Sequence, residues 1–416
     1  MSLIEELSQT ALLRKCWKSI YAGKNEDVRQ FSRGVDNISL IDFKLKENSL
    51  LPQIAEDLSK KTYQIQALKA FPVEKGLGKY RLITAPTVSD RIVHKAILSV
   101  INKYFYQTIN TGVSYCGVKK NIWSKKKNEW NNVSAIKKLM EKVKNRYFWV
   151  LESDIKGFFD SVPKYNLLKQ ITSLLPDSSI NCLLEKIVYF EVRNIDEILN
   201  KTKYKDKIKM PEKQKGISQG SPLSPLFSNI YLSGFDNKVK DLCGDSYIRY
   251  VDDFLVLADS KEKAKELKIQ LLSFVDEIGL ELAEDKTEIV NLKDGGESLK
   301  FLGLRINNKK ICAKNPGKIK TRFDQEYLNF NSKKIRKKKT HSKKIELINY
   351  MIAGCANFYR PFHCKKLLEE LNMLIRNKTE HKKLKNKLLG VRLIDINKVT
   401  TSRIINEDAW RAYFQP

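Results

Sequence analysis

Residues 250–253 (YVDD) place two adjacent acids between two short runs, 247–249 and 254–258, whose side chains are mainly apolar. Such runs on either side of a two-residue break predict two strands joined by a tight turn. Asn-Gly or Asp-Gly would suit that turn better, so an Asp-Asp pair is locally costly and indicates function. A solvated acidic turn is the alternative. We predict a β-hairpin whose tip carries two carboxylates.

A third acid, Asp154, follows the aromatic and β-branched run 147–151, which predicts a buried strand. Gly157 then allows a turn that places Phe159 about one side chain beyond the end of this strand. Taken alone, Asp154 would cap the next helix and Phe159 would be a core residue. The acidic hairpin further along the chain favours a functional interpretation of both.

Three carboxylates on two separate strand ends suit divalent cations. Asp154, Asp252, Asp253 and the backbone carbonyl of Ile155 offer the hard oxygen ligands that Mg²⁺ prefers. Two such ions about 3.5–4 Å apart stabilise the attacking and leaving oxygens of a displacement at phosphorus. The sequence therefore predicts a nucleotidyl-transfer site with two Mg²⁺ ions.

Charge and composition narrow the partners. The 416 residues carry a formal net charge of +29, which favours a nucleic-acid partner over an anionic membrane surface or simple solubility. Seven scattered cysteines without a CxxC pair, and only four histidines, argue for reduced thiols and against a zinc site. The N-terminus lacks the features of a signal peptide, and no run reaches the roughly 18–20 apolar residues that span a bilayer. We expect a soluble cytoplasmic protein with no membrane partner.

The hydrophobic pattern predicts an α+β fold, a small antiparallel sheet backed by helices. We expect strands at 246–258, 286–292 and 299–306 and an exposed lysine-rich loop at 201–215. A turn at 76–78 is expected to join two further strands within 72–86. Helices are expected over 1–65, 89–106, 221–240 with Pro222 in its first turn, 261–279, and from about 315 onward.

Two further segments are candidates for substrate contacts. Lys75, Lys79 and Arg81 surround a tight turn and could clamp a triphosphate, although a basic surface turn is an equal alternative and the segment is not a P-loop. Gln219 and Gly220 would let the backbone approach a base pair closely, where the alternative is an N-capped loop. The basic run 333–344 and the aromatic segment 357–362 are candidates for contacts with a nucleic-acid backbone, a solvated face and core packing being their ordinary meanings.

From about residue 40 to about 310 the chain resembles bacterial reverse transcriptases of the group II intron, retron and defence-associated lineage. The most specific segments are those around Asp154, SQGSPLSPLFSNIYL at 218–232, and YVDD. Further matches are 79–81, 87–93, 284–287 and 301–304. Ser218 stands where many relatives have Pro, and Val251 replaces a common Ala, which puts the local turn and the fidelity of copying in question.

The resemblance implies RNA-directed DNA polymerase activity on an RNA template with dNTPs, giving an RNA–DNA hybrid. It implies that Phe159 is a steric gate against ribonucleotides, that Gln219 and Gly220 line the nascent pair, and that Lys286 is a general acid toward pyrophosphate. The metal ligands would be Asp154, Ile155, Asp252 and Asp253, and the triphosphate contacts Lys75, Lys79 and Arg81.

The resemblance also implies a right-hand polymerase with fingers, an RRM-like palm and a helical thumb. We expect N-terminal helices and fingers at 1–145, palm at 146–162 and 213–312, a connection at 163–212, and a basic thumb and C-terminal region at 313–416. The length of the chain and the resemblance together imply a stand-alone enzyme that copies a dedicated noncoding RNA in antiphage defence. A splicing cofactor and a template-independent or protein-primed polymerase are the alternatives.

Overall fold

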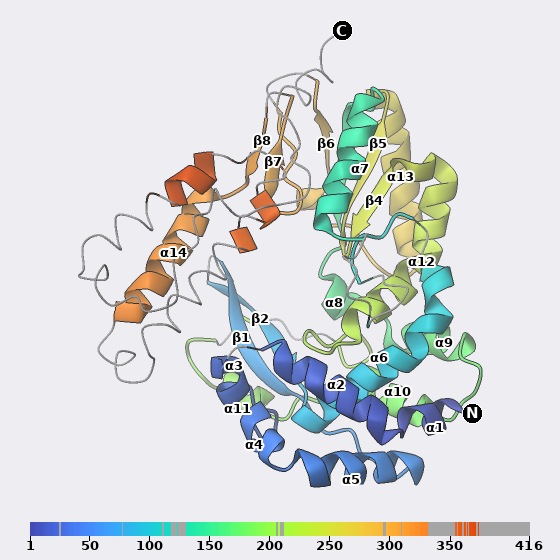
Figure 1. Cartoon of the computed structure of the whole chain (residues 1–416). Coiled ribbons are helices and arrows are strands. Elements are labelled where there is room, and N and C mark those ends of the chain that lie inside the picture. The colour runs from blue at the N-terminus through green and yellow to red at the C-terminus, as the bar shows by residue number, and fades with distance from the viewer. Residues whose placement is uncertain are drawn as a thin grey trace. The chain divides into compact units, whose positions relative to one another are not determined.

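The structure is a computed structural model of the whole chain (Figure 1). It describes residues 1–24, 26–76, 78–109, 112–117, 123, 130–204, 207–208, 212–293, 297–308, 310–331, 354–355, 357–359, 362, 364, 366–371 and 373. At residues 27, 75, 76, 323 and 326–331 only the backbone is described. The basic run predicted at 333–344 lies outside these residues. Among the described residues, no helix combines the length and the apolar character needed to cross a bilayer.

The chain divides into two compact units, and the first comprises Met1–Asn131, Ser153–Phe254 and Lys268–Thr287. Its helices are α1 (Leu3–Leu7), α2 (Thr10–Ala22), α3 (Glu26–Phe31), α4 (Leu40–Leu45), α5 (Glu47–Ser59), α6 (Val88–Ile109), α8 (Phe158–Ser161), α9 (Lys164–Ser173), α10 (Asn181–Val188), α11 (Ile195–Leu199) and α12 (Ser224–Cys243), with short 3₁₀ turns at Gly244–Ser246 and Glu284–Lys286. Its strands include β1 (Lys69–Gly76), β2 (Lys79–Ala85) and β4 (Tyr247–Tyr250).

Helix α6 is the centre of this unit. Ile92, Val93, Ala96, Ile97 and Val100 recur at a spacing of three and four residues, and all are buried. This stripe makes α6 an amphipathic helix, and α1, α2 and α12 all pack against it. The predicted helix at 89–106 is thereby confirmed, as are the N-terminal helices.

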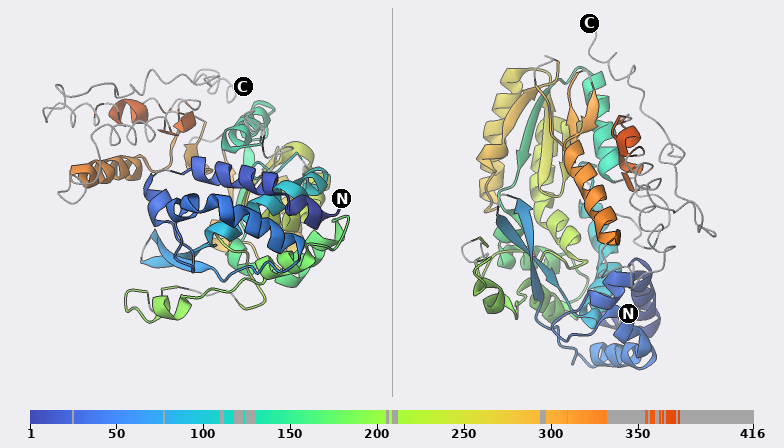
Figure 2. Two further views of the ribbon diagram at one scale, coloured as in Figure 1. Left: turned by 60° about the horizontal axis from the view of Figure 1, so that its bottom comes forward. Right: turned by 90° about the vertical axis from the view of Figure 1, so that its left-hand side faces the viewer.

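Strands β1 and β2 form an antiparallel hairpin with Val73 opposite Arg81 (Figure 2). One face of the hairpin packs through Ala70 into a small apolar cluster with Ile198 and Ile208. Ile208 belongs to the segment predicted as an exposed loop at 201–215, so its burial corrects that prediction at this position. A backbone bond from the Tyr80 amide to the Lys207 carbonyl, 3.1 Å long, causes the correction because it draws the segment onto β2.

The second unit comprises Asn132–Glu152, Leu255–Leu267 and Glu288–Pro416. It contains α7 (Asn132–Lys144), β6 (Glu288–Asn291), β7 (Leu304–Ile306), β8 (Ile311–Ala313) and α14 (Pro316–Asn331). Strands β3 (Trp149–Asp154) and β5 (Asp253–Ala258) and helix α13 (Lys261–Glu277) each have residues in both units.

Four strands form a sheet in the order β4–β5–β3–β6, and β3 is antiparallel to β6 with Val150 opposite Val290. The α+β class predicted from the sequence is thus confirmed. The strand predicted at 299–306 is shorter, because Leu302 and Gly303 have φ of 47° and 79° and make a turn. After this turn β7 pairs with β8, which the sequence did not predict.

The start of helix α12 also corrects a prediction. The helix begins at Ser224 with Pro225 in its first turn, three residues after the predicted start at Ser221. Ser221 instead closes a turn, in which its hydroxyl accepts the Leu223 amide at 3.2 Å and its carbonyl accepts the Ser224 amide at 3.2 Å. Because the first turn of a helix tolerates proline, whose missing N–H has no partner within the helix there, Pro225 suits the observed start.

A histidine on α6 is enclosed completely. His94 is 2% exposed, and its Nδ1 lies 3.0 Å from the Ser221 hydroxyl. Its Nε2 is buried without a hydrogen-bond partner among the described residues. Burial lowers the pKa of His94 from 6.5 to about 3, so the ring is neutral in the folded protein.

We expect His94 to make the protein less stable in mild acid. Between pH 6.5 and 3 the unfolded chain binds a proton that the folded chain excludes, so stability is lost as the pH falls through this range. The free energy of unfolding should decrease by about 2 kcal/mol through this group between pH 7.5 and 5. Urea unfolding of wild type and His94→Asn at both pH values measures the difference, and the same pH dependence in both proteins would contradict it.

Candidate active site

The acidic hairpin exists as predicted. Strands β4 and β5 are joined through Val251 and Asp252, and Asp253 begins β5. Val251 has a φ of 63°, a left-handed conformation that is a true outlier for a β-branched residue. Residues held in such conformations cost about 1–3 kcal/mol and are concentrated at functional sites.

The end of β3 lies directly against this hairpin tip. The amide of Ile155 donates to the carbonyl of Asp252 at 3.3 Å, and the carbonyl of Asp154 accepts the amide of Ala283 at 2.8 Å. Asp154 is 7% exposed and Ile155 is 1% exposed. Backbone hydrogen bonds therefore bring the first acid, the second acid and the segment that carries Lys286 together.

The pKa values of Asp252 and Lys286 are both shifted in this cluster. Burial, followed by the charges of Asp154 and Asp253, raises the pKa of Asp252 to about 6, although Lys286 opposes the shift. The Lys286 ammonium forms an ion pair with Asp154 Oδ2. Burial lowers the pKa of Lys286, but the hydrogen bond and charge of Asp154 outweigh it, so that the pKa is raised.

The donor set fits divalent cations. Asp154 Oδ1 is buried and has no hydrogen-bond partner among the described residues, an acceptor that a cation would satisfy. The described residues contain no three His, Cys, Asp or Glu side chains already gathered as a metal site. In this arrangement the positively charged partner of Asp154 is the ammonium of Lys286.

A second group of predicted residues lies along α8, just after β3. Gly157 is the N-cap of this helix, with a φ of 55°, and Phe158 is buried while Phe159 is only partly buried. The Phe159 carbonyl accepts the Ile217 amide at 2.7 Å. Gln219 Nε2 lies 3.4 Å from Asp160 Oδ1. The loop before α12 is thus fixed beside Phe159, as a shared substrate pocket requires.

Gly220 allows this loop to meet strand β2. A Cβ added at Gly220, whose φ is 154°, would lie 1.8 Å from the Thr84 carbonyl oxygen. The Thr84 amide donates to the Gln219 carbonyl at 2.9 Å. A side chain at position 220 would break this approach, which explains the glycine there.

The predicted triphosphate contacts lie on the β1–β2 hairpin. Lys79 begins β2, and Arg81 follows two residues later; both are exposed. None of the described contacts links either side chain to the three acids. The side chain of Lys75 lies outside the described part of the chain. The clamping role of these three residues stays a prediction.

Sequence analysis missed the residues that support the hairpin. Arg249 belongs to a run interpreted as mainly apolar, yet its guanidinium is completely buried against Asp236. Asn229 also bonds this guanidinium, at 3.1 Å. Two signals in the sequence were available. Arg249 is a charged residue within an otherwise apolar strand, and Asn229 and Asp236 are seven positions apart, which places them on one face of α12.

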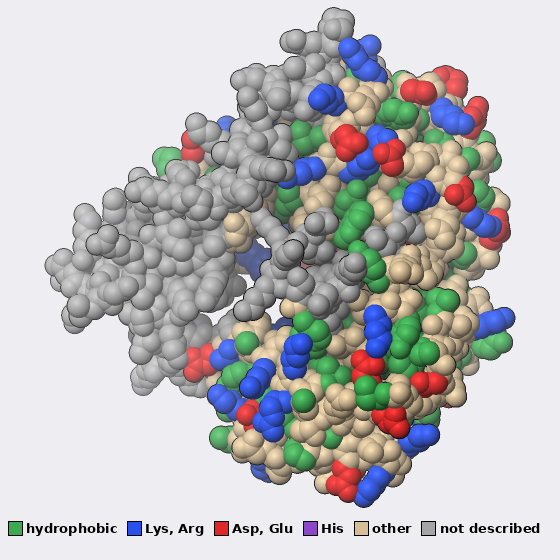
Figure 3. Space-filling view, turned by 45° about the vertical axis from the view of Figure 1, so that its right-hand side comes forward, with side chains coloured by type: hydrophobic (Ala, Val, Ile, Leu, Met, Phe, Trp, Pro, Cys, Tyr) green, Lys and Arg blue, Asp and Glu red, His purple; other side chains and the backbone are tan. Residues whose placement is uncertain are grey.

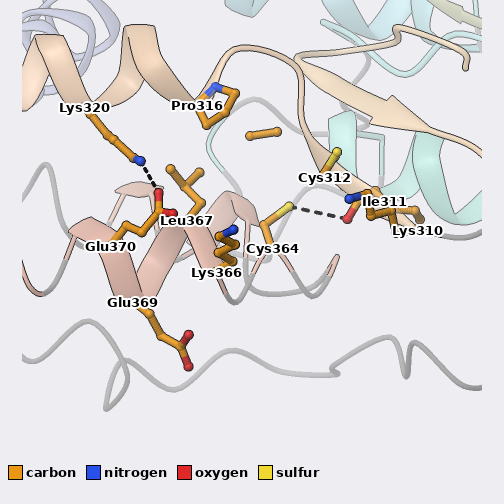
Figure 4. Close-up of a pocket in the computed structure, with 11 residues that line it drawn as sticks. Lys310, Ile311, Cys312, Pro316, Lys320, Cys364, Lys366, Leu367, Glu369 and Glu370 are labelled. Atoms are coloured by element: carbon orange, nitrogen blue, oxygen red, sulfur yellow. Dashed lines mark hydrogen bonds and ion pairs between the residues drawn. The ribbon is translucent and has the colours of Figure 1, made fainter.

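Two other features of the described surface are its charge pattern and a cavity in the second unit. On the face shown in Figure 3, Lys and Arg side chains are interspersed with Asp and Glu rather than forming one uninterrupted patch. In the second unit, a cavity of about 610 Å³ is lined by β8, by Pro316 and Lys320 of α14, and by Lys310, Cys364, Lys366, Leu367, Glu369 and Glu370 (Figure 4). The Lys320–Glu370 ion pair lies at its wall. None of the predicted site residues lines this cavity.

Comparison with known proteins agrees with this geometry. The family model described as "Reverse transcriptase (RNA-dependent DNA polymerase)" matches residues 69–306, more than half of the chain. Protein YkfC of Escherichia coli K12 is 24% identical over 312 residues, which cover 67% of this chain and 76% of that protein. The group II intron-encoded protein LtrA of Lactococcus lactis is 22% identical over 338 residues, covering 65% and 52%.

Two further similarities are more limited. The retron Ec83 reverse transcriptase of Escherichia coli is 24% identical over 251 residues, covering 58% of this chain and 62% of that protein. Among solved structures, apo telomerase from Candida tropicalis has a TM-score of 0.44 and 14% identity, covering 76% of this chain and 56% of that chain. The chain thus spans about half to three quarters of these curated relatives.

We expect Lys286 to compete with metal ions for Asp154. Replacing it in Lys286→Met should tighten Mg²⁺ binding about two- to five-fold, because an exposed ion pair contributes up to about 1 kcal/mol. Titration calorimetry with Mg²⁺ measures this without any turnover. Lys156→Met is the matched control, since Lys156 pairs with Glu281 at 2.7 Å instead, and its affinity should not change. Equal affinities in Lys286→Met and wild type would contradict the competition.

Proposed function

The chain belongs to the reverse transcriptase (RNA-dependent DNA polymerase) family, and we propose that it extends a primer strand by copying RNA into DNA at the Asp154–Asp252 cluster. The observation that carries this proposal is the hydrogen bond from the Ile155 amide to the Asp252 carbonyl. It joins two residues with carboxylates on separate strands, where burial and then the charge of Asp154 raise the pKa of Asp252 to about 6. A perturbed carboxylate cluster of this kind is typical of a functional site, and bound cations would relieve its repulsion.

Asp154, Asp252 and Asp253, with the carbonyl of Ile155, would hold two Mg²⁺ ions. When bound, the ions would lower the pKa of the primer hydroxyl and hold the triphosphate. Lys286 would act on the leaving group, a role supported by its raised pKa, which keeps the ammonium protonated at neutral pH. Once released from Asp154, this ammonium would donate a proton to the departing pyrophosphate.

Selection of deoxynucleotides would fall to α8 and the loop before α12. Phe159 is partly exposed, while its neighbour Phe158 is packed against it at 5.5 Å between ring centroids. This edge-on packing fixes the ring of Phe159, so that it can exclude a 2′-hydroxyl. Gln219 beside it would line the nascent pair, with Gly220 leaving room for the backbone.

The template is proposed to be a structured noncoding RNA that is dedicated to this enzyme. The net charge of +29 suits a large polyanion, and the similarity to a retron reverse transcriptase supports the same class of template. The resemblance to defence-associated relatives suggests antiphage defence as the setting. Similarity to a group II intron-encoded protein favours one second candidate, a splicing cofactor that binds RNA.

One experiment separates these functions. The protein and its Asp252→Asn/Asp253→Asn variant are purified from cells that carry the native locus, and copurifying RNA and newly made DNA are sequenced. Wild type with dNTPs and Mg²⁺ should yield DNA complementary to one abundant RNA. The variant should bind the same RNA and make no DNA, because it has lost the carboxylates that would bind the metal ions.

The other outcomes are informative. Undiminished synthesis by the variant would contradict the assignment of this site. Bound RNA without DNA from wild type would favour the splicing cofactor. DNA unrelated to the RNA, or DNA attached to the protein, would indicate untemplated or protein-primed synthesis.

We expect Phe159→Ala to relax discrimination against ribonucleotides by at least about ten-fold, since the clash with the 2′-hydroxyl is removed. The ratio of kcat/KM for dNTP and rNTP measures it in primer extension. Phe105→Leu is the control, because Phe105 is buried within helix α6 and its replacement should affect stability rather than this ratio. An unchanged ratio in Phe159→Ala would rule out the gate.

A further inference from the structure

The strained turn at Val251 is held by a side chain from its own strand. Arg249 Nη1 donates to the Val251 carbonyl at 2.9 Å. The Ile155 amide donates to the next carbonyl, that of Asp252, at 3.3 Å. The carbonyls of Val251 and Asp252, which follow one another at the hairpin tip, are therefore fixed by different donors. The Asp252 side chain is carried by the Cα between these two carbonyls.

The guanidinium of Arg249 is itself immobilised by helix α12. Its Nε donates to Asp236 Oδ1 at 2.7 Å, and its Nη2 donates both to Asp236 Oδ2 and to Asn229 Oδ1. The side chain of Arg249 is 0% exposed and that of Asp236 is 1% exposed. Residues Asn229, Asp236 and Arg249 are called the Arg249 network below.

The network is also tied to the segment that flanks β4. Asn229 Nδ2 donates to the Cys116 carbonyl at 2.7 Å, and the Ser114 hydroxyl donates to Asn229 Oδ1 at 2.8 Å. The Arg249 amide donates to the Val113 carbonyl at 2.8 Å. Hydrogen bonds with residues 113–116 thus hold both the Arg249 backbone and the Asn229 side chain that accepts from its guanidinium.

Stability alone does not explain so costly an arrangement. Well-packed apolar residues often replace a buried ion pair without loss of stability, so a buried pair is weak evidence for a stabilising role. An arginine is specifically suited to the geometry here, because its planar fork binds the Asp236 carboxylate bidentately and still directs a donor to the Val251 carbonyl. The compact ammonium of a lysine cannot do both.

We propose that Arg249 is a positioning residue for Asp252. Through the Val251 carbonyl, the Arg249 network holds the turn in its left-handed conformation and so sets the Asp252 carboxylate against Asp154. This inference rests on the proposed polymerase function of the site. In this role Arg249 acts only through the backbone of the turn, and not by contact with the substrate or with the carboxylates of Asp154 and Asp252.

The test uses the full chain with Arg249→Lys, which keeps a positive charge beside Asp236 and loses the bond to the Val251 carbonyl. Primer extension on a generic RNA template with a DNA primer should show kcat reduced roughly 100-fold, as expected for a displaced reacting group. The KM for dNTP should stay within about two-fold. Binding of Tb³⁺ to the acids, followed by luminescence, should weaken in parallel.

Tyr247→Phe is the matched control. The Tyr247 hydroxyl donates to Asp236 Oδ1 at 2.8 Å, so this variant removes a hydrogen bond from the same buried carboxylate but leaves Val251 untouched. Its Tm should fall, while its kcat and Tb³⁺ affinity stay at wild-type values. A loss of kcat in Tyr247→Phe equal to that in Arg249→Lys would show a merely structural role and overturn the proposal.

Rescue provides the second arm, and it also covers the case in which Arg249→Lys fails to fold. Val251→Gly takes a positive φ without steric cost, so Arg249→Lys/Val251→Gly should fold and regain at least about ten-fold of the lost kcat. No gain over a folded Arg249→Lys, or wild-type kcat in Arg249→Lys, would overturn the proposal.

If wild type makes no DNA, the polymerase assignment fails, and the Tb³⁺ affinity alone then decides on the positioning role. Weaker Tb³⁺ binding in Arg249→Lys supports that role, and equal binding refutes it.

Discussion

Repulsion between the carboxylates of Asp154 and Asp252 is the constraint on which the site depends. Folding gathers them with their charges partly buried, and backbone bonds from Ile155 and Ala283 oppose the repulsion. Lys286 neutralises one of them. A protein selected for stability alone would not keep such a cluster, because burial and a neighbouring like charge raise the pKa of Asp252 and destabilise the fold. Under the function proposed above, bound cations would relieve this repulsion.

Backbone hydrogen bonds also hold the other predicted site residues of the first unit in place. The positions of the site residues are set by main-chain hydrogen bonds: Ile217 to Phe159, Thr84 to Gln219, and Ile155 to Asp252. Buried polar groups support the same loops: His94 lies against the Ser221 hydroxyl before α12, and Arg249 donates to the Val251 carbonyl in the hairpin turn.

Much of this was accessible from the sequence because it depends on local pattern. The apolar spacing of α6, the strand that ends at Asp154 and the acidic hairpin all have short-range signatures, and family resemblance placed Lys286 near the acids. What the sequence could not supply depends on tertiary pairing. Arg249 finds its counter-ion on another element, Ile208 is buried because β2 pairs with its segment, and of two nearby prolines only Pro225 lies within α12.

The bond between Thr84 and Gln219 has a consequence for how the family can vary. It joins two backbones, so the bond itself excludes only proline at position 84, while burial of Thr84, which is 6% exposed, restricts the size of its replacement. Position 220 is more restricted still, since a single added methyl group would collide with the Thr84 carbonyl. The junction of strand β2 with the loop before α12 therefore limits side-chain size at position 84 and excludes every side chain at position 220.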